Sequence, residues 1–512
     1  MIFTKFYFSS IFTRSNKFRS VCKVKEKGST FFFNKNLRLI SSSSEDATYI
    51  EKQIQEVFKY KNRNVSNWII ENKANTFCHE YHQSKLADKQ RTLRILASKY
   101  AVQHDTVCSI AEKLICTECE NERRLISYEQ NLKNALSPDY KWLFVIIGRL
   151  ENGVKFLVDL RTDILELLSE IKETEDSIAI QQLNITLREL LLLWFSVGFL
   201  HLERVTWQSA CDLLQKISDY EAIHPVKNWL DLKHRVGPYR RCYIFTHPSM
   251  PREPLVVLHT ALCDIIPSSV KGIEEAKVRI LGEFKKDITF SEEHKTKIKA
   301  AIFYSITSTQ KGLQGIELGN YLIKEVVKQI ISEFPMIDEL SSLSPIPNFR
   351  SWLLEKMKQD INLIFTSEEY KSVQTTLNDE NVALCLKKIF NNSLWTNDVS
   401  LCEVLKVPLL RACAWYLYKE KRRNYALNSV ANFHLRNGAV MWRINWLADP
   451  SPRGVANSCG IMVNYRYYLD ECEKNSQNYI ENYFINASEN VINLTMQQEN
   501  LQNTVQKKGC DK

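Results

Sequence analysis

The sequence predicts an α+β protein in which an N-terminal all-α helical bundle, over residues 45–195, precedes an α/β domain over residues 196–490. Three observations lead to this prediction. The chain has 512 residues, which is too many for one ordinary hydrophobic core. Apolar residues recur at spacings of three and four from about residue 45 to 200, as on the buried face of a helix. Near residue 235 this period gives way to aromatic and β-branched runs around a proline-containing turn, which is typical of a β-hairpin.

The first 42 residues differ in composition from the rest of the chain. They hold nine Lys and Arg residues and a single acid, Glu26, together with many aromatic and Ser residues. The net charge of +9 therefore comes almost wholly from this segment, and the nearly neutral remainder argues against nucleic acid as a partner. A basic, Ser-rich and acid-poor composition is typical of a mitochondrial presequence. We therefore predict a presequence over residues 1–42, with a disordered basic tail as the alternative.

The predicted helical region has no hairpin signal and little proline. Leu157, Leu160, Ile164 and Leu167 illustrate its period, and Pro138 is its one interruption. Its longest largely apolar run, residues 190–200, has eleven residues, whereas a membrane span needs about 20. We therefore expect a buried helix at this run and no membrane span.

The 14 cysteines follow no regular spacing, which favours a reducing compartment over a disulfide framework. Cys116 and Cys119 form a lone C-x-x-C motif with no second pair at zinc-ribbon distance. Cys78, His79 and His82 lie in a helical stretch, where chance placement is favoured over a metal site. We therefore predict no metal site.

The second half predicts a mixed sheet with a strong antiparallel component. Residues 241–247 and 255–262 are the expected strands of the hairpin, because prolines between them supply a turn. The Gln- and Asn-rich end, residues 491–512, predicts a flexible tail. The elements expected between hairpin and tail are a helical stretch near 273–299, a strand at 301–306, a Gly-rich turn, a long amphipathic helix, helices over 352–425 and strands within 440–470.

The Gly-rich turn, residues 314–320, joins the predicted strand to the amphipathic helix. Unpaired backbone N–H groups at a helix start suit phosphate, and glycines let the backbone approach an anion closely. The turn resembles the pyrophosphate loop of GNAT-type acetyltransferases, Gln/Arg-x-x-Gly-x-Gly, with Gln314 first and Gly319 last. Glu317 replaces the middle glycine, and because a carboxylate beside phosphates is unfavourable, we expect it to point away from them. An ordinary helix start is the alternative.

Two short polar segments offer groups for proton transfer. Residues 341–347 contain Ser344, whose backbone is constrained by the prolines that follow it. Residues 431–439 contain His434. Each residue alone has a plainer interpretation, because a Ser before Pro is usually a turn residue and a His beside Phe is usually a packing residue.

Taken together, these segments resemble the malonyl-CoA decarboxylase family. The resemblance covers at least residues 190–490 and, in weaker form, the helical region before them. It implies an N-terminal helical domain used in oligomer contacts, a catalytic domain related to GNAT acetyltransferases, and a homotetramer. The segments that carry it, in chain order, are 235–242, 253–259, 314–320, 341–347, 413–418, 431–446 and 464–467.

The resemblance implies that the substrate is malonyl-CoA, converted to acetyl-CoA and CO₂ in support of fatty-acid metabolism. It implies that Ser344 and His434 are the catalytic pair and that Ser305, Glu317 and Tyr467 are further active-site residues. The residues that it places along the bound malonyl-CoA are Gln314, Gly315, Ile316, Glu317, Leu318, Gly319 and Asn320.

The proposed chemistry suits these residue types. Loss of CO₂ leaves a carbanion whose charge the thioester carbonyl takes up as an enolate, so no cofactor or metal is required. The imidazole of His434, which ordinarily titrates near neutral pH, can deliver a proton to the carbon. Ser344 can bind the substrate carboxylate or relay a proton, and the sequence leaves open which of the two residues handles the proton at carbon.

Two other functions stay open at this point. One is an acyl-CoA-dependent transferase, which needs an acceptor amine or hydroxyl, and the other is a non-catalytic malonyl-CoA-binding scaffold. The basic clusters 240–241 and 421–423 either bind the phosphates of coenzyme A or are solvated surface charge. Because the sequence ends without Ser-Lys-Leu, we expect the mitochondrial matrix rather than the peroxisome. Redox control through Cys211 depends on its exposure.

Overall fold

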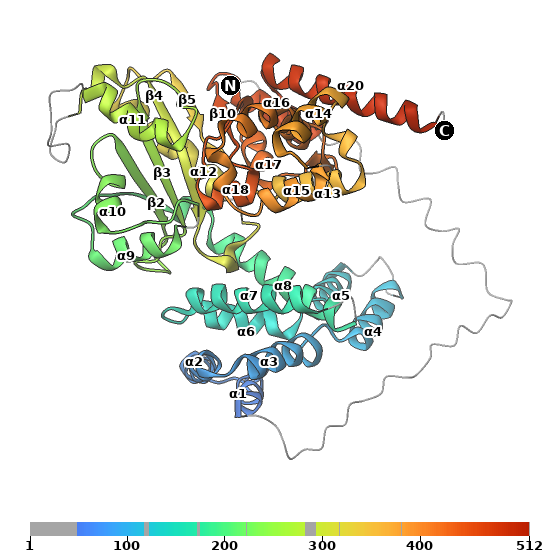
Figure 1. Ribbon diagram of the computed structural model, residues 1–512. Helices are drawn as coiled ribbons and strands as arrows, with labels where there is room; N and C mark the ends of the chain where they lie inside the picture. Colours follow the sequence, from blue (N-terminus) through green and yellow to red (C-terminus); the bar gives the residue numbers. More distant parts are fainter. Residues whose placement is uncertain are drawn as a thin grey trace, which may run out of the picture. The chain divides into compact units, whose positions relative to one another are not determined.

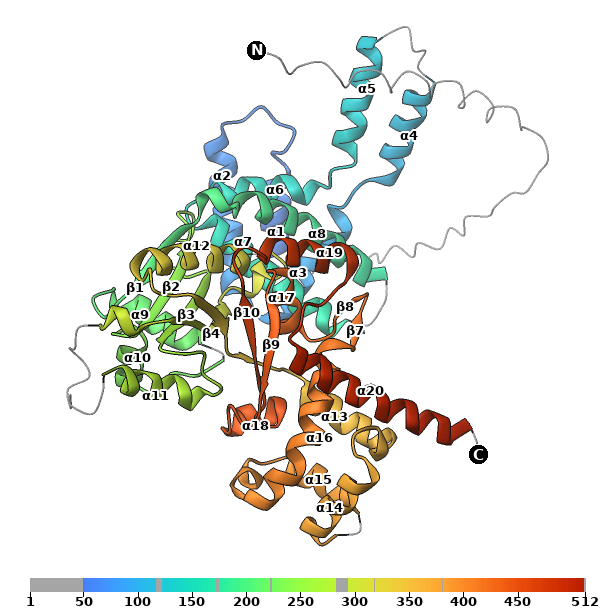
Figure 2. The ribbon, with the colours of Figure 1, turned by 90° about the horizontal axis from the view of Figure 1, so that it is seen from above.

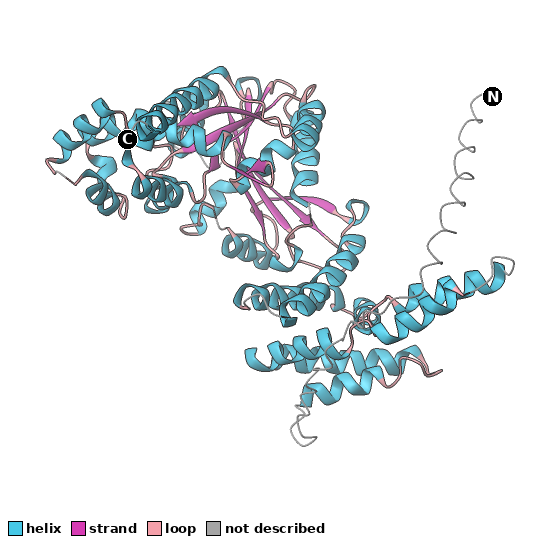
Figure 3. Ribbon diagram, turned by 90° about the vertical axis from the view of Figure 1, so that its right-hand side faces the viewer, coloured by secondary structure: helices cyan, strands magenta, loops and turns pink. Residues whose placement is uncertain are grey.

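The structure of the chain, a computed structural model, describes residues 49–116, 122–171, 175–221, 223–281, 293–316, 318–379 and 381–510. The predicted presequence, together with Cys119 and Glu317, lies outside the described residues. The protein is α+β, as the sequence predicts, with strands confined to the part of the described chain after residue 200 (Figure 3).

Residues 49–194, which we call the helical half, contain helices alone among their described residues. Helix α7 shows why the sequence folds in this way, because Leu157, Leu160, Ile164 and Leu167 follow its period and are all buried. The helices are α1 (Tyr49–Phe58), α2 (Asn67–Gln83), α3 (Leu86–Lys99), α4 (His104–Ile115), α5 (Glu122–Ala135), α6 (Asp139–Gly148), α7 (Gly153–Glu170) and α8 (Glu175–Trp194).

The run 190–200 is not the single buried helix that the sequence predicts. Helix α8 ends at Trp194 and a short 3₁₀ helix, η2 (Val197–Phe199), follows it. Leu193 and Phe199 are 70% and 59% exposed. The run therefore changes conformation after Trp194. No helix among the described residues is long and apolar enough to cross a membrane.

Residues 197–510, which we call the sheet half, are built around one mixed sheet. Its strands lie in the spatial order β1-β2-β3-β4-β5-β10-β6, and β9 pairs with β10. Figure 1 shows β2 to β5 of this order, and Figure 2 shows β1 to β4 together with β9 beside β10. The strands are β1 (His201–Val205), β2 (Arg240–Thr246), β3 (Val256–Cys263), β4 (Ala300–Ser308), β5 (Glu339–Ser342), β6 (Ser344–Pro345), β9 (Val440–Asn445) and β10 (Met462–Tyr467), and β7 (Lys421–Arg422) pairs with β8 (Tyr425–Ala426) outside this sheet.

The predicted hairpin is confirmed, because β2 and β3 pair antiparallel from Arg240↔Ala261 to Phe245↔Val256. Every residue of β3 is buried, and helices lie on both of its faces. Leu258 and Leu262 belong to the large core that also contains residues of α12 (Leu318–Glu333), whereas Cys263 packs with residues of α11 (Val270–Leu281). Helices α9 (Cys211–Tyr220) and α10 (Trp229–Arg235) cover the part of the sheet near β2.

An opening in the sheet follows from the pairing of β4 with β5. These two strands are parallel and pair from Ala300↔Glu339 to Phe303↔Ser342. Beyond that point β4 continues to Ser308, while the segment after β5 leaves β4 and stays paired with β10, as β5 is, through Val463↔Ser344. The register of β3 with β4 also shifts between His259↔Ser305 and Thr260↔Phe303, which is a bulge at Tyr304. The two strands therefore separate just before Ser344.

The C-terminal end departs from the predicted flexible tail. Helix α20 (Glu489–Cys510) packs on α16 (Val399–Tyr418), and Val491, Thr495 and Gln498 are buried. The polar composition is misleading because the Gln498 Oε1 atom accepts a hydrogen bond from Arg411 Nε at 2.9 Å. The other helices of this part are α13 (Phe349–Gln359), α14 (Ser367–Leu377), α15 (Val382–Ile389), α17 (Ser429–Arg436), α18 (Pro452–Ser458) and α19 (Cys472–Asn482).

Candidate active site

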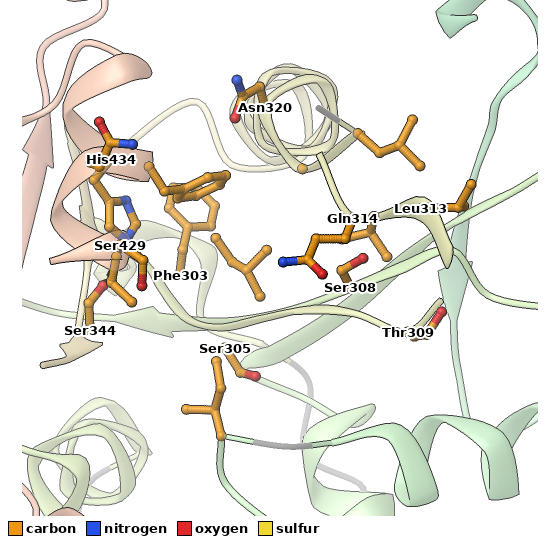
Figure 4. A pocket seen from close by; sticks show the side chains of 18 of the residues that line it. Phe303, Ser305, Ser308, Thr309, Leu313, Gln314, Asn320, Ser344, Ser429 and His434 are labelled. Atoms are coloured by element: carbon orange, nitrogen blue, oxygen red, sulfur yellow. Dashed lines mark hydrogen bonds between the residues drawn. The ribbon is translucent and has the colours of Figure 1, made fainter. Parts of the chain in front are cut away.

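A cavity of about 730 Å³ occupies the opening beside β4. This size is typical of a small-molecule site. Most of the predicted site residues line this cavity, and Figure 4 shows Ser344 and His434 on one side of it and Gln314 on the other. The predicted residues among its lining are Ser305, Gln314, Gly315, Ile316, Leu318, Gly319, Asn320, Ser344 and His434.

Ser344 is held at the wall of the cavity by the short strand β6. It is 4% exposed, and its Oγ donates to Ser342 Oγ at 2.8 Å. Ser342 Oγ in turn accepts from the backbone N–H of Tyr465 at 3.2 Å. The serine is therefore tied through Ser342 to β10, which fixes the direction of its hydroxyl.

His434 reaches the same wall from α17. The Asn428 side chain caps this helix by accepting from the Ala431 N–H at 2.9 Å. The same side chain donates from Nδ2 to the Pro347 carbonyl at 3.0 Å. Asn428 thus links the start of α17 to the segment that carries Ser344. This link holds the imidazole and the hydroxyl at a fixed separation.

A chain of hydrogen bonds joins three of the predicted residues. His434 Nε2 lies 2.8 Å from Ser344 Oγ, and His434 Nδ1 lies 2.7 Å from the Tyr467 hydroxyl. Tyr467 is not among the residues that line the cavity, so it contacts the site through His434. The ring of Tyr465 stacks on the imidazole at a centroid distance of 4.5 Å. Both ring nitrogens are therefore engaged and the ring plane is fixed.

The charge state of His434 differs from the sequence-based expectation. Burial lowers the pKa of His434 to about 3, because the imidazolium would lose its hydration. Burial likewise raises the pKa of Tyr467 far above its ordinary value. At neutral pH the imidazole is therefore neutral and holds one N–H. Since Ser344 donates to Ser342, that N–H is on Nε2 and Tyr467 donates to Nδ1.

Two positions in the loop 314–320 favour glycine, each for a different structural reason. Gly315 has φ +79°, which favours glycine, and Gly319 lies where a Cβ would be 3.2 Å from the Phe433 ring. Asn320 Oδ1 accepts from Asn437 Nδ2 at 3.0 Å, which ties the start of α12 to the end of α17. The loop and the Ser344–His434 pair are therefore parts of one packed unit.

Ser305 belongs to a buried polar cluster that the sequence did not reveal. Its hydroxyl donates to Glu221 Oε2 at 2.8 Å, and the backbone N–H groups of Ile223 and His224 donate to Glu221 Oε1. His259 Nε2 lies 3.3 Å from Glu221 Oε2. Burial lowers the pKa of His259 to about 4, although Glu221 acts to raise it. Ser305 thus contributes an oxygen to the cavity while its proton points towards Glu221.

Glu221 and His259 were missed because they lie 38 residues apart in sequence and neither forms a local motif. Burial opposes ionisation of Glu221, yet its contacts with His259, the two N–H groups and Ser305 hold its pKa below the ordinary value. The signal that could have found them is a charged or titratable residue within an apolar segment, as His259 is within β3.

The basic cluster 240–241 is neither a phosphate site nor solvated surface. Arg241 is 2% exposed and forms ion pairs with Glu293 at 2.7 Å and Glu333 at 2.6 Å. Arg240 is also buried and pairs with Glu274. By contrast, Lys421 and Arg422 are exposed, which agrees with solvated surface charge. Both sequence-based interpretations of 240–241 were wrong, because both assumed that these arginines are exposed.

Among the described candidates, Cys78 differs in exposure from the two histidines near it in sequence. Cys78 is buried and burial raises its pKa to about 12, whereas His79 and His82 are exposed. Within the described residues no group of three or more His, Cys, Asp or Glu side chains could hold a metal ion. Cys211 is exposed at the start of α9.

Fold and site together define a class of protein. It is an α+β protein with a helical N-terminal region, a mixed sheet that opens between two parallel strands, and a buried Ser–His–Tyr chain at a ligand-sized cavity. Two family models match this chain, the malonyl-CoA decarboxylase N-terminal domain over residues 107–195 and the C-terminal domain over residues 198–506. The chain belongs to the malonyl-CoA decarboxylase family.

Named relatives and solved structures agree with this assignment. The mitochondrial malonyl-CoA decarboxylase of Anser anser anser is 46% identical over 427 residues, which are 81% of this chain and 82% of the relative. That of Rattus norvegicus is 46% identical over 422 residues, or 81% and 83%. The crystal structure of malonyl-CoA decarboxylase from Rhodopseudomonas palustris superimposes with a TM-score of 0.72 at 28% identity, covering 86% of this chain and 98% of the other. The resemblance noted in the sequence is thereby confirmed.

Proposed function

We propose that this chain converts malonyl-CoA to acetyl-CoA and CO₂ and that Ser344 and His434 carry out the proton transfer. The observation that supports the proposal is the hydrogen-bonded chain from Tyr467 through His434 to Ser344, at the wall of the cavity lined by the loop 314–320. Control of the malonyl-CoA level would then be its role in fatty-acid metabolism.

The reaction begins with cleavage of the bond between the substrate carboxylate and the α-carbon. The electron pair of that bond enters the thioester carbonyl, CO₂ leaves, and an enolate is formed. The site must hold the carboxylate out of the thioester plane and donate a hydrogen bond to the developing oxyanion. The cavity walls at the loop 314–320 and at Ser344 are suited to hold the two ends of such a substrate.

Protonation of the α-carbon completes the reaction. Because His434 Nε2 is engaged by Ser344, we propose that the Ser344 hydroxyl turns from Ser342 to the substrate and gives its proton to carbon while His434 Nε2–H replaces it. Tyr467 donates to Nδ1 and so stabilises the imidazolate that this transfer leaves at His434, and solvent restores the proton to Nε2 after acetyl-CoA leaves. The neutral imidazole, rather than an imidazolium, is thus the proton donor to Ser344, as burial requires.

Product analysis with carboxyl-labelled malonyl-CoA tests the function. We expect stoichiometric labelled CO₂ and acetyl-CoA from the purified chain. An acetylated or malonylated acceptor as the main product would favour the transferase alternative, and tight binding without any product would favour the scaffold alternative.

The pH profile tests the protonation step. A neutral His434 has no imidazolium proton to lose between pH 6 and 8. We therefore expect no decline in kcat from this cause over that range. An imidazolium donor would instead make kcat fall as the pH rises through about 6.5. Measurement of kcat across this range, with Tyr467→Phe as a companion variant, separates the two. We expect Tyr467→Phe to lower kcat by roughly tenfold, since it removes one hydrogen bond from the imidazole.

Two further parts of the proposal concern location and assembly. We propose that residues 1–42 direct the chain to the mitochondrial matrix, on the composition of this segment and the mitochondrial names of the relatives. Import of a reporter fused to residues 1–42 into isolated mitochondria tests this. We also propose that residues 45–195 form the oligomer contacts of a homotetramer, which sedimentation equilibrium of the full chain tests.

A further inference from the structure

Arg161, on α7 of the helical half, is a buried arginine that contacts the segment before and at the start of the loop 314–320. Its side chain is 2% exposed and donates hydrogen bonds in three directions. Nε donates to Asn184 Oδ1 on α8 at 3.0 Å. Nη1 donates to the Gly312 carbonyl at 2.5 Å and Nη2 to the Gln314 carbonyl at 2.9 Å. The planar guanidinium thus binds two backbone carbonyls at the start of the loop 314–320.

Other contacts hold the same segment. Arg188 on α8 donates from Nη2 to the Gly315 carbonyl at 2.9 Å. A Cβ at Gly312 would lie 1.8 Å from the carbonyl oxygen of Val158, so the backbone of α7 touches this segment directly. Side chains of the helical half therefore donate hydrogen bonds to three carbonyls, those of Gly312, Gln314 and Gly315. Gln314 and Gly315 are also residues that line the cavity.

The electrostatic setting of Arg161 is unusual. No carboxylate in the described part of the chain acts on it as a counter-charge, and the acceptors named above are neutral. Burial, and then the neighbouring charge of Arg188, lower the pKa of Arg161 to about 10. A buried cation without a carboxylate partner is costly to a fold. Packing alone does not explain its presence, because an apolar residue would fill the same space without that cost.

We propose that Arg161 is a positioning residue for acyl-CoA binding. It fixes the segment 311–316, at the start of the loop 314–320, through the Gly312 and Gln314 carbonyls, and Arg188 assists it by binding the Gly315 carbonyl. The helical half thereby sets the affinity of a cavity whose reacting groups all belong to the sheet half. The positive charge behind the loop also favours a ligand with anionic phosphates. This inference rests on the proposed function, and it concerns binding of the coenzyme A part rather than the chemical step.

The test compares Arg161→Gln with Arg161→Lys in the full chain. For Arg161→Gln we expect KM for malonyl-CoA and Kd for acetyl-CoA to rise at least tenfold, with kcat changed by less than about threefold. This size follows because charged hydrogen bonds contribute about 1.5–3 kcal/mol each. Arg161→Lys keeps the charge and can reach one carbonyl, so we expect it to recover part of the affinity. A residue that is only structural would lower Tm and the active fraction without this split between KM and kcat.

Controls keep the inference distinguishable from failure of the proposed function. Arg149→Met removes an exposed arginine of the same helical half and should leave KM unchanged. Arg188→Met removes the exposed helper and should raise KM about threefold, even where Arg161→Gln folds too poorly to be assayed. Calorimetric measurement of acetyl-CoA binding needs no turnover. It therefore tests the inference even if the proposed decarboxylase activity is not found. Unchanged KM and Kd in Arg161→Gln, or an equal loss in kcat, would overturn the inference.

Discussion

The helical half and the sheet half contribute to one cavity by different means. The sheet half supplies side chains, Ser344 and His434, whose polar atoms face each other at 2.8 Å. The helical half supplies Arg161 and Arg188, which donate hydrogen bonds to backbone carbonyls of the segment 312–315. The first kind of contribution depends on residue type at a few positions, and the second depends on where the backbone runs.

This difference suggests a division of labour. Groups that exchange a proton with the substrate must be close to it, whereas groups that hold a loop act through the loop. We therefore expect changes in the sheet half to alter kcat and changes in the helical half to alter KM.

The largest expected effect is that of His434→Gln. Glutamine keeps the size and one hydrogen bond but cannot relay a proton, so we expect kcat to fall by about 10²- to 10⁴-fold with KM little changed. Steady-state kinetics and a Kd for acetyl-CoA measure this, with the exposed His201→Gln as the control. A rise in KM without loss of kcat would assign His434 to binding and would break the division of labour.

The next largest effect is that of Gly312→Ala, which acts at the contact between the two halves. The new methyl group would lie 1.8 Å from the Val158 carbonyl oxygen, so α7 and the loop must move apart. We expect a loss of about 1–3 kcal/mol in stability and a rise in KM larger than the fall in kcat. Thermal unfolding and kinetics measure both.

Gly198→Ala is the matched control for that substitution, because open space surrounds Gly198. If Gly312→Ala changed Tm alone, with KM at its original value, the contact would be structural and the loop would not depend on α7 for its binding conformation.

Much of the fold was accessible from the sequence because its signals are local. The period of α7 and the paired strands β2 and β3 follow from residue spacing alone, and both are present in the structure. The tail was mispredicted as flexible because α20 is stabilised by contacts far away in sequence, such as Arg411 with Gln498. Local polarity cannot report a partner 87 residues distant.

The site shows the same limit. Ser344, His434 and Tyr467 were predicted as site residues through a family resemblance, and their mutual distances come only from the structure. Glu221 and Arg161 were missed because their partners include backbone groups, which every residue type carries. The neutral state of His434 was also out of reach, since its cause is burial rather than any neighbour in sequence.

Stability in acid is expected to show a smaller effect that also differs between the two halves. The buried histidines of the described chain, His247, His259 and His434, all belong to the sheet half. Burial lowers the pKa of His259 to about 4 and that of His434 to about 3, from an ordinary value of 6.5. Between these values the unfolded chain binds more protons than the folded chain, so stability falls as the pH drops below 6.5.

We therefore expect Tm to decrease from pH 6.5 towards 4 and the slope to be flatter in His259→Gln. The exposed His104→Gln, in the helical half, should leave the slope unchanged. Hydrogen exchange at pH 5 should show loss of protection in β3 and β4 before α7. Earlier loss in α7 would mean that the helical half, not the buried histidines, limits stability in acid.

The smallest expected effect is that of Glu166→Gln, which breaks the ion pair at 2.8 Å between Glu166 on α7 and Lys311. The two side chains are 46% and 69% exposed, so solvent screens the pair and its contribution should be under about 1 kcal/mol. We expect KM to change by less than about twofold, as in Asp159→Asn, which breaks a partly exposed ion pair within α7 that does not involve Lys311. A tenfold rise in KM for Glu166→Gln alone would show that the surface ion pair holds the loop, and it would remove the main argument for the buried guanidinium of Arg161.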